Sequence, residues 1–291
     1  GELARLLSRH PKMSLEAITS RQLAGKNVAD THPFLRGYVD LKFSESITGE
    51  GMDVVFLATP HGASMKLVPD LVRSGAKVID LSGDYRLKDP QVYKEWYGHE
   101  HTDLDNLGRA VYGLNELYWD EIAEADFVSN PGCYPTCSAL GLAPLFLNKL
   151  VEGPVFIDAK SGTSGAGVEP TKATHHPRCG ASVNPYKVGS HRHTPEIAQT
   201  LGLLQGDLCL ALVAYIQTQR IGEDKDGAER DQNHQQGTSV LGCFGGGMFG
   251  QIASGKCRRH GQRWSSNEVT VDVVQAASSV KQKRSLLSRL R

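Results

Sequence analysis

The chain has 291 residues, of which 40% are apolar, and this length favours two domains with sizeable cores. Its 32 basic and 32 acidic residues balance, which argues against a nucleic-acid partner, and no run of about 18 uncharged apolar residues predicts a membrane span. Six cysteines are too few for a disulfide scaffold, so we expect a reducing, cytoplasmic setting.

The first half of the chain alternates predicted helices and strands. A helix with an apolar face, made of Leu3, Ala4, Leu6 and Leu7, is already under way at residue 1. Strands are expected at residues 14–19, 53–58, 77–81 and 125–129, and a further helix at 66–74. This alternation predicts an α/β fold with a doubly wound parallel sheet of Rossmann type. Such sheets bind ligands beyond the carboxyl ends of their strands, where Gly, Ser and Pro turns follow here.

A doubly wound sheet normally opens with a strand and a Gly-rich turn that precede the first helix. Because this chain starts inside that helix, we expect a dinucleotide domain that lacks its first strand. The phosphate-binding turn would be missing with it, apart from Gly1, so we expect weak dinucleotide binding. The alternative is a short helix that simply begins the fold.

The segment Ser-Asn-Pro-Gly-Cys-Tyr-Pro-Thr at residues 129–136 is the most informative part of the sequence. Cys133 follows a Pro-Gly turn and precedes an apolar, helix-compatible segment at 137–150. A thiol at a helix N-terminus is expected to have a lowered pKa. The imidazoles of His191 and His193 could hold, acidify or deprotonate it, so Cys133 is a candidate nucleophile. The other interpretation is a buried cysteine in a turn.

The second half opens with a predicted strand at 154–160 and a Gly/Ser-rich loop at 161–167. The loop either lines a ligand or is a flexible surface loop. Thr194 is expected to cap a helix that has Pro195 in its first turn. The histidines and cysteine of 175–179 are residue types found in zinc sites, but their spacing fits no structural zinc pattern, and we predict no metal.

A series of motifs, in order along the chain, resembles the N-acetyl-gamma-glutamyl-phosphate reductase family of the aspartate-semialdehyde dehydrogenase superfamily. The motifs are GELARLL at 1–7, TSR at 19–21, LATPHG at 57–62, VIDLSGDYRLKD at 78–89, WYGHEH at 96–101, AVYGLNEL at 110–117, SNPGCYPT at 129–136, DAKSGTSGAG at 158–167 and SHRHTPEI at 190–197. The resemblance covers residues 1 to about 200.

The resemblance implies an NADP-binding Rossmann-type domain at 1–132, truncated at its N-terminus, and an α+β catalytic and dimerisation domain at 133–291. It implies NADPH-dependent reduction of N-acetyl-glutamyl 5-phosphate to N-acetyl-glutamate 5-semialdehyde, with release of phosphate through a cysteine thioester. This reaction belongs to arginine biosynthesis. The expected partners are a small acyl-phosphate substrate and further copies of the chain, as a dimer or tetramer, with no nucleic acid and no membrane.

The resemblance also assigns roles to single residues. Cys133 would be the nucleophile and His191 its acid–base partner, whereas His193 would face the other way if the segment is extended. Ser20 and Arg21 match the place that holds the adenosine 2′-phosphate, where an Arg and no acidic residue favours NADP over NAD. A solvated arginine at a strand end is the alternative for Arg21. The remaining expected contacts are Pro60, Ser164 and Gly165 to the cofactor, and Arg86, Asn130 and His193 to the substrate.

Other functions stay open. They are a related acyl-phosphate reductase of lysine biosynthesis, an aspartate-semialdehyde dehydrogenase, a cofactor-free thiol hydrolase that uses Cys133 and His191, or an inactive truncated remnant. After Leu201 the chain no longer resembles the family: residues 224–237 are polar and 242–250 are Gly-rich. Residues 201–291 are therefore atypical, through either divergence or a frame shift. We expect the polar stretch not to form the buried strands of a dimer sheet.

Overall fold

The computed structural model of the chain describes residues 1–151, 155–167, 169–180 and 182–205, and beyond them the strands at 210–217, 241–243, 248–253, 258–259, 262–263 and 269–275. The expectation for residues 224–237 lies outside these described residues. Of the Gly-rich segment 242–250, only the parts that belong to strands are described.

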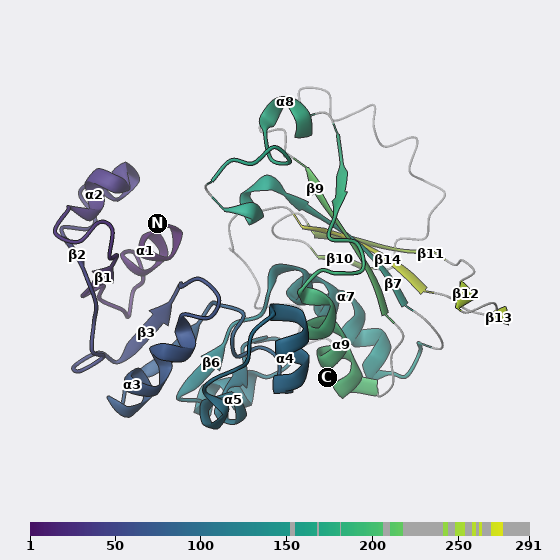
Figure 1. Ribbon diagram of the computed structural model, residues 1–291, viewed down its shortest axis with the longest axis horizontal. Helices are drawn as coiled ribbons and strands as arrows, with labels where there is room; N and C mark the ends of the chain where they lie inside the picture. The colour runs from purple at the N-terminus through teal and green to yellow at the C-terminus, as the bar shows by residue number, and fades with distance from the viewer. Residues whose placement is uncertain are drawn as a thin grey trace.

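A four-stranded parallel sheet forms the centre of the first half of the chain (Figure 1). Its strands lie in the order β3-β4-β6-β5, and their bounds are Val54–Leu57, Lys77–Asp80, Phe127–Ser129 and Val111–Tyr112. The helices between them are α3 (Val68–Arg73), α4 (Pro90–Tyr97), α5 (Leu104–Arg109) and α6 (Trp119–Glu124), and a 3-10 turn occupies Ser64–Lys66. The predicted doubly wound α/β arrangement is confirmed. β3, β4 and β6 are one or two residues shorter than predicted, and β5 is a strand that the sequence did not predict.

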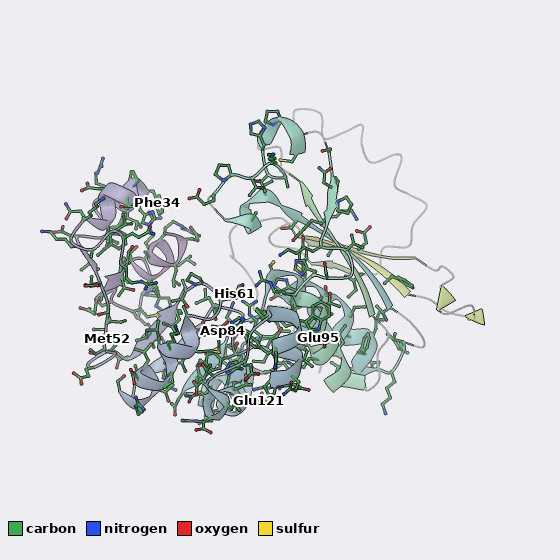
Figure 2. All side chains as sticks on the ribbon, viewed as in Figure 1. Phe34, Met52, His61, Asp84, Glu95 and Glu121 are labelled. Carbon is green, nitrogen blue, oxygen red and sulfur yellow. The ribbon has the colours of Figure 1, made fainter. Side chains whose placement is uncertain are left out.

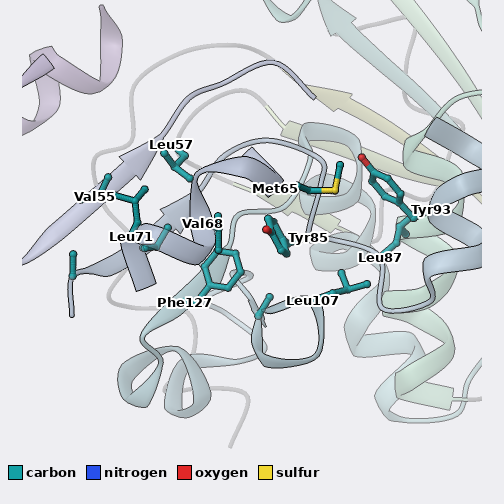
Figure 3. Close-up of a cluster of buried hydrophobic side chains, with 13 residues drawn as sticks. Val55, Leu57, Met65, Val68, Leu71, Tyr85, Leu87, Tyr93, Leu107 and Phe127 are labelled. Carbon is teal, nitrogen blue, oxygen red and sulfur yellow. The ribbon is translucent and has the colours of Figure 1, made fainter. Parts of the chain in front are cut away.

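The core of this unit lies between the sheet and its helices (Figure 3). It is built from apolar side chains of the strands and of the segments that cross over them, namely Val55, Leu57, Met65, Val68, Leu71, Val78, Tyr85, Leu87, Tyr93, Leu107 and Phe127. Full burial of one such large apolar side chain stabilises the fold by about 1.5–3 kcal/mol. Along β3 and β4 buried residues alternate with half-buried or exposed ones, so this core covers one face of the sheet.

The N-terminal segment forms a smaller unit of its own. It contains α1 (Glu2–Leu7), α2 (Val28–Thr31), a 3-10 turn at Pro33–Leu35, and a two-stranded parallel sheet of β1 (Ile18–Thr19) and β2 (Phe43–Ser44). The strand predicted at 14–19 is thus only two residues long, and it pairs with β2 instead of joining the four-stranded sheet. Leu6 was expected in the buried face of α1 but is 52% exposed, because this six-residue helix buries only Ala4.

The second half of the chain forms a six-stranded mixed sheet in the order β10-β11-β14-β7-β9-β8. Their bounds are Leu241–Cys243, Met248–Ala253, Val269–Gln275, Val155–Gly162, Leu210–Gln217 and Asn184–Tyr186; a separate hairpin pairs β12 (Arg258–Arg259) with β13 (Gln262–Arg263). β7 is parallel to both of its neighbours, and the outer pairs are antiparallel. The predicted α+β character of this half is confirmed.

Two long helices, α7 (Cys133–Leu147) and α9 (His193–Gln205), pack against each other and against this sheet (Figure 1). Alternate residues of β7 point into their common core, which holds Leu142, Phe146, Val155, Ile157, Ala159, Ile197 and Leu201. The predicted helix at 137–150 therefore starts four residues earlier, at the cysteine itself. A single helical turn, α8, covers His176–Cys179. None of the helices in the described ranges has the length and apolar character to cross a membrane.

Candidate active site

Cys133 is held at the junction between β6 and α7. β6 ends at Ser129, and Gly132 is the N-cap of the helix, with extended backbone angles (φ −67°, ψ 162°). The Asn130 N–H donates to the Asp80 carbonyl at 2.7 Å, so the turn between them is fixed to the end of the neighbouring strand β4. Cys133 is half-buried, in contrast to the buried Cys137 one turn later. The turn therefore presents one thiol to a reagent and hides the other.

The pKa of the Cys133 thiol is raised above its ordinary value, chiefly because the residue is buried. Backbone N–H groups at the start of α7 and the charge of Arg86 act in the opposite direction, whereas the Glu196 carboxylate adds to the increase. The expectation that the helix N-terminus lowers the pKa of Cys133 is thus wrong, because the net change is an increase. The dipole acts as expected, but desolvation outweighs it.

Glu196 is a site residue that sequence reasoning missed. It lies in the first turn of α9 and its side chain is fully buried. Its Oε1 atom accepts hydrogen bonds from the Gly132 N–H at 2.8 Å and from the Tyr112 hydroxyl at 2.7 Å. Its Oε2 atom lies 3.7 Å from Nη1 of Arg86. Glu196 therefore ties α9 to the turn that carries Cys133. The only signal in the sequence was an acidic residue soon after the histidine pair.

Arg86 holds the same turn from the other side. Its Nε donates to the Asn130 carbonyl and its Nη2 to the Leu81 carbonyl, both at 2.8 Å. Its backbone is held in turn by Gln199 of α9, whose Nε2 donates to the Arg86 carbonyl at 3.0 Å. Arg86 and Asn130 were expected to contact substrate. The structure gives their polar groups protein partners that position Cys133, and the substrate contact stays a prediction.

His191 is buried and has a defined neutral tautomer. Its Nδ1 accepts the backbone N–H of His193 at 3.1 Å, so the proton of the neutral ring is on Nε2. Nε2 lies 3.3 Å from the Tyr186 hydroxyl, which donates to the hydroxyl of Tyr134, the residue after Cys133, at 3.0 Å. Burial, with smaller contributions from Lys187 and Arg192, lowers the pKa of His191 to about 4. The ring is therefore neutral at pH 7 and presents an N–H.

His193 lies beside His191, with the two ring centroids 4.7 Å apart. The expectation that it faces the other way is wrong, because the segment turns into α9 at His193 instead of staying extended. A Cβ atom on Gly132 would overlap the His193 ring, so this imidazole packs directly on the N-cap of the cysteine helix. Burial, followed by the neighbouring His191 and the nearby arginines, lowers its pKa to about 2.

Thr194 does not cap α9. The helix begins at His193, one residue before Thr194, and the Thr194 hydroxyl is buried with no hydrogen-bond partner among the residues described. The predicted helix start is therefore right to within two residues, but the predicted capping interaction is wrong. Because the helix starts early, both histidines are brought to the same end of it.

A second polar cluster, which contains His61 and Asp84, lies beyond the carboxyl ends of β3 and β4 (Figure 2). The Gly62 N–H donates to the Asp84 carboxylate at 2.8 Å, and the hydroxyls of Ser64 and Tyr93 donate to it at 2.7 and 2.8 Å. The His61 Nδ1 accepts the Gly83 N–H at 3.0 Å. Asp84 thus shapes the loop that follows Pro60. Pro60 itself was expected to contact the cofactor.

The remaining predicted cofactor residues lie on two separate elements. Ser20 follows β1 and donates its N–H to the Ser44 carbonyl at 2.9 Å, and Arg21 is exposed with no ion pair in the described part of the chain. Ser164 and Gly165 are exposed in a 3-10 turn at Thr163–Ala166 that follows β7. Within the described ranges, no cluster of three His, Cys, Asp or Glu side chains could hold a metal ion.

Comparison with known proteins assigns both halves of the chain. Residues 1–125 match the family described as semialdehyde dehydrogenase, NAD binding domain, and residues 133–218 match semialdehyde dehydrogenase, dimerisation domain. The N-acetyl-gamma-glutamyl-phosphate reductase of Methanopyrus kandleri is 53% identical over 213 residues, which cover 72% of this chain and 62% of that protein. The enzyme of the same name from Methanocaldococcus jannaschii is 48% identical over 204 residues, covering 69% and 60%.

The chain thus spans about three fifths of the length of these curated relatives. The match to the dimerisation domain extends past residue 200, near which the sequence motifs predicted that the resemblance ends. Aspartate semialdehyde dehydrogenase II from Vibrio cholerae shares the fold, with a TM-score of 0.50 and 12% identity over 73% of this chain and 64% of that one. Together, the matched domains and relatives show that the chain belongs to the semialdehyde dehydrogenase family, within which it is similar to the N-acetyl-gamma-glutamyl-phosphate reductases.

Proposed function

We propose that this chain catalyses the NADPH-dependent reduction of N-acetyl-glutamyl 5-phosphate to the 5-semialdehyde, with release of phosphate, as a step of arginine biosynthesis. The observation that carries the proposal is the half-buried Cys133 at the start of α7, in a turn held by Glu196. Next to this turn lie two neutral imidazoles, the buried His191 and the half-buried His193. The family match and the names of the similar reductases supply the reaction.

In the first step the sulfur of Cys133 attacks the acyl carbon. A carbon–sulfur bond forms, the bond to the phosphate oxygen breaks, and inorganic phosphate leaves. A thiolate suits this task because it is both a good nucleophile and a good leaving group. In the free protein the thiol has a raised pKa, so its proton leaves the sulfur as attack proceeds and is taken up by the departing phosphate. His191 is neutral with its proton on Nε2, so it acts as a hydrogen-bond donor toward the acyl oxygen.

In the second step the thioester is reduced and the aldehyde leaves. The Nε2–H of His191 donates to the oxygen of the tetrahedral carbon, which is negatively charged after reduction. When the carbon–oxygen double bond re-forms from this oxyanion, the carbon–sulfur bond breaks, and the Cys133 thiolate is released and takes up a proton from solvent. The hydroxyls of Tyr186 and Tyr134 link the His191 Nε2 to the first turn of α7, and they hold the ring in place.

The carboxyl edge of the parallel sheet fits a nicotinamide dinucleotide. The hydroxyl oxygens of Thr59 and Ser129, at the ends of β3 and β6, are buried and have no hydrogen-bond partner within the described ranges. Such polar atoms need a partner, which a bound ligand can provide. Ser20 and Arg21 would hold the adenosine 2′-phosphate, and Pro60 would line the site. When bound, the cofactor supplies the hydride that reduces the acyl carbon.

The domain arrangement and the assembly belong to the same proposal. We assign residues 1–132 to cofactor binding and 133–291 to catalysis and dimerisation, with Ser164 and Gly165 on the loop after β7 as further cofactor contacts. The match to a dimerisation domain supports a homo-oligomer, a dimer or a tetramer. A reducing compartment, the cytoplasm, suits a catalytic thiol that must not be oxidised.

Replacement of Cys133 tests the proposal. The assay follows phosphate-dependent reduction of NADP by N-acetyl-glutamate 5-semialdehyde, the reverse reaction. Cys133→Ser is expected to lower turnover by about 10³-fold or more while its NADPH affinity stays equal to that of the parent chain. Cys137→Ser is the matched control on the same helix and should retain activity, because its thiol is buried in the core. Near-normal turnover of Cys133→Ser, or loss only in Cys137→Ser, would remove the assignment.

A further inference from the structure

Arg192 lies between the two site histidines and has an unusual environment for a cation. Its guanidinium carbon is 5.3 Å from the centroid of the Tyr97 ring, at the end of α4. The residue is half-buried, and none of the ion pairs found among the described residues involves it. Arg86, a second cation of the site, has two carbonyl acceptors and lies near the Glu196 carboxylate. Lys187, which also acts on His191, is exposed. Arg192 is therefore a half-buried cation of this site without an ion pair in the described part of the chain.

Neutral hydrogen-bond donors surround this charge. His61 packs edge-on against Tyr97, with ring centroids 5.4 Å apart, and because its Nδ1 accepts the Gly83 N–H, its Nε2 carries the proton. Burial lowers the pKa of His61, and the charge of Arg192 lowers it further. The same charge contributes to the lowered pKa of His191 and of His193. Desolvation is the largest cause for each of the three imidazoles, of which His61 is exposed on one side, and the charge of Arg192 acts on all three in the same direction.

Asp84, an acidic group near His61, is already occupied. The charge of Asp84 acts on His61 in the direction that raises its pKa, but the Asp84 oxygens accept hydrogen bonds from the Gly62 N–H and from the hydroxyls of Ser64 and Tyr93. A half-buried cation is favourable when an anion faces it, and a guanidinium matches the two oxygens of a carboxylate or phosphate group. The protein supplies no such anion to Arg192 within the described ranges.

We propose that Arg192 and the N–H of His61 form an oxyanion subsite beside the catalytic pair, which binds an anionic group of the substrate. The bound group is either the free carboxylate of the acyl chain or the phosphate that leaves. Its assignment to the substrate rests on the proposed function, whereas the binding of an oxyanion does not. By this inference Arg192 selects substrates that carry a negative charge, either on a carboxylate remote from the acyl carbon or on the phosphate that leaves it.

The experiment measures protection of Cys133 from iodoacetamide, with the alkylated peptide quantified by mass spectrometry at constant ionic strength. The probes are inorganic phosphate and N-acetylglutamate, each titrated separately. Arg192→Met should weaken protection by about 10- to 100-fold, the usual range for losing a charge-assisted contact. Arg192→Lys keeps the charge and should retain most of it. Arg73→Met, on the exposed face of α3, should leave protection unchanged.

The two probes separate the two sources of the anion. Protection by phosphate alone that depends on Arg192 assigns the subsite to the leaving group, and protection by N-acetylglutamate alone assigns it to the carboxylate. The inference is overturned if neither probe protects the parent chain, or if Arg192→Met and the parent are protected equally. Because no turnover is needed, the result is independent of the proposed function: Arg192-dependent protection in a chain without reductase activity would retain the subsite and reject the reaction.

Discussion

Replacement of Glu196 tests how the site is held together. The fully buried carboxylate accepts hydrogen bonds from the Gly132 N–H and the Tyr112 hydroxyl, and it is the nearest anion to Arg86. Glu196→Ala leaves both donors and the guanidinium uncompensated in the interior. Removing one partner of a buried ion pair costs about 3–5 kcal/mol, so we expect the free energy of unfolding to fall by about this amount. Glu196→Gln keeps an oxygen for the two donors and loses only the charge, and we expect a loss of about 1–2 kcal/mol.

The measurement is urea unfolding followed by tryptophan fluorescence. Glu95→Ala is the matched control, since Glu95 is exposed on α4 (Figure 2), and it should change the free energy of unfolding by no more than about 0.5 kcal/mol. The reasoning is refuted if Glu196→Ala lies within about 1 kcal/mol of the parent chain. It is also refuted if Glu196→Gln and Glu196→Ala are equally destabilised, because the two hydrogen bonds would then contribute nothing.

Three further predictions concern the groups around the cysteine. The pKa of His191 is about 4 in the folded chain and about 6.5 when unfolded, so the unfolded chain takes up the proton first and stability falls as the pH drops from 6.5 to 4. His191→Asn should reduce this loss of unfolding free energy by about 1–3 kcal/mol, as measured by urea unfolding at pH 6.5 and 4.5. Equal losses in the parent chain and in His191→Asn would contradict the prediction. The Cβ atom of Gly132→Ala would overlap the His193 ring, so this variant should lower the free energy of unfolding by about 1–3 kcal/mol. Gly108 lies in open space on α5, so Gly108→Ala should raise the free energy of unfolding by about 0.5–1 kcal/mol. The reverse order of the two urea midpoints would refute this prediction. Because the pKa of Cys133 is raised, its alkylation rate should still increase at pH 9, and a plateau below pH 8 would show that the thiol ionises more easily.

Local patterns in the sequence were sufficient for the fold class and for the candidate nucleophile. The short apolar runs at 53–58, 77–81 and 125–129, each bounded by turn residues, predict strands, and the structure places β3, β4 and β6 there. The Pro-Gly turn before Cys133 likewise acts within a few residues, and it starts a helix at the cysteine. Hydrophobic periodicity and turn chemistry are short-range, so one sequence is enough to read them.

Only the tertiary structure decided the electrostatics and the partners of the site. Glu196 and Gly132 are 64 residues apart in the chain, and no local pattern joins them. The pKa of Cys133 and the orientation of His193 were both predicted wrongly, because burial and the early start of α9 depend on how the two halves pack. Desolvation is set by every element that covers a group, whereas a helix dipole or a strand alternation is set by the group's own neighbours. The sequence therefore determined which residues could do the chemistry, and packing decided their protonation states and which of them meet.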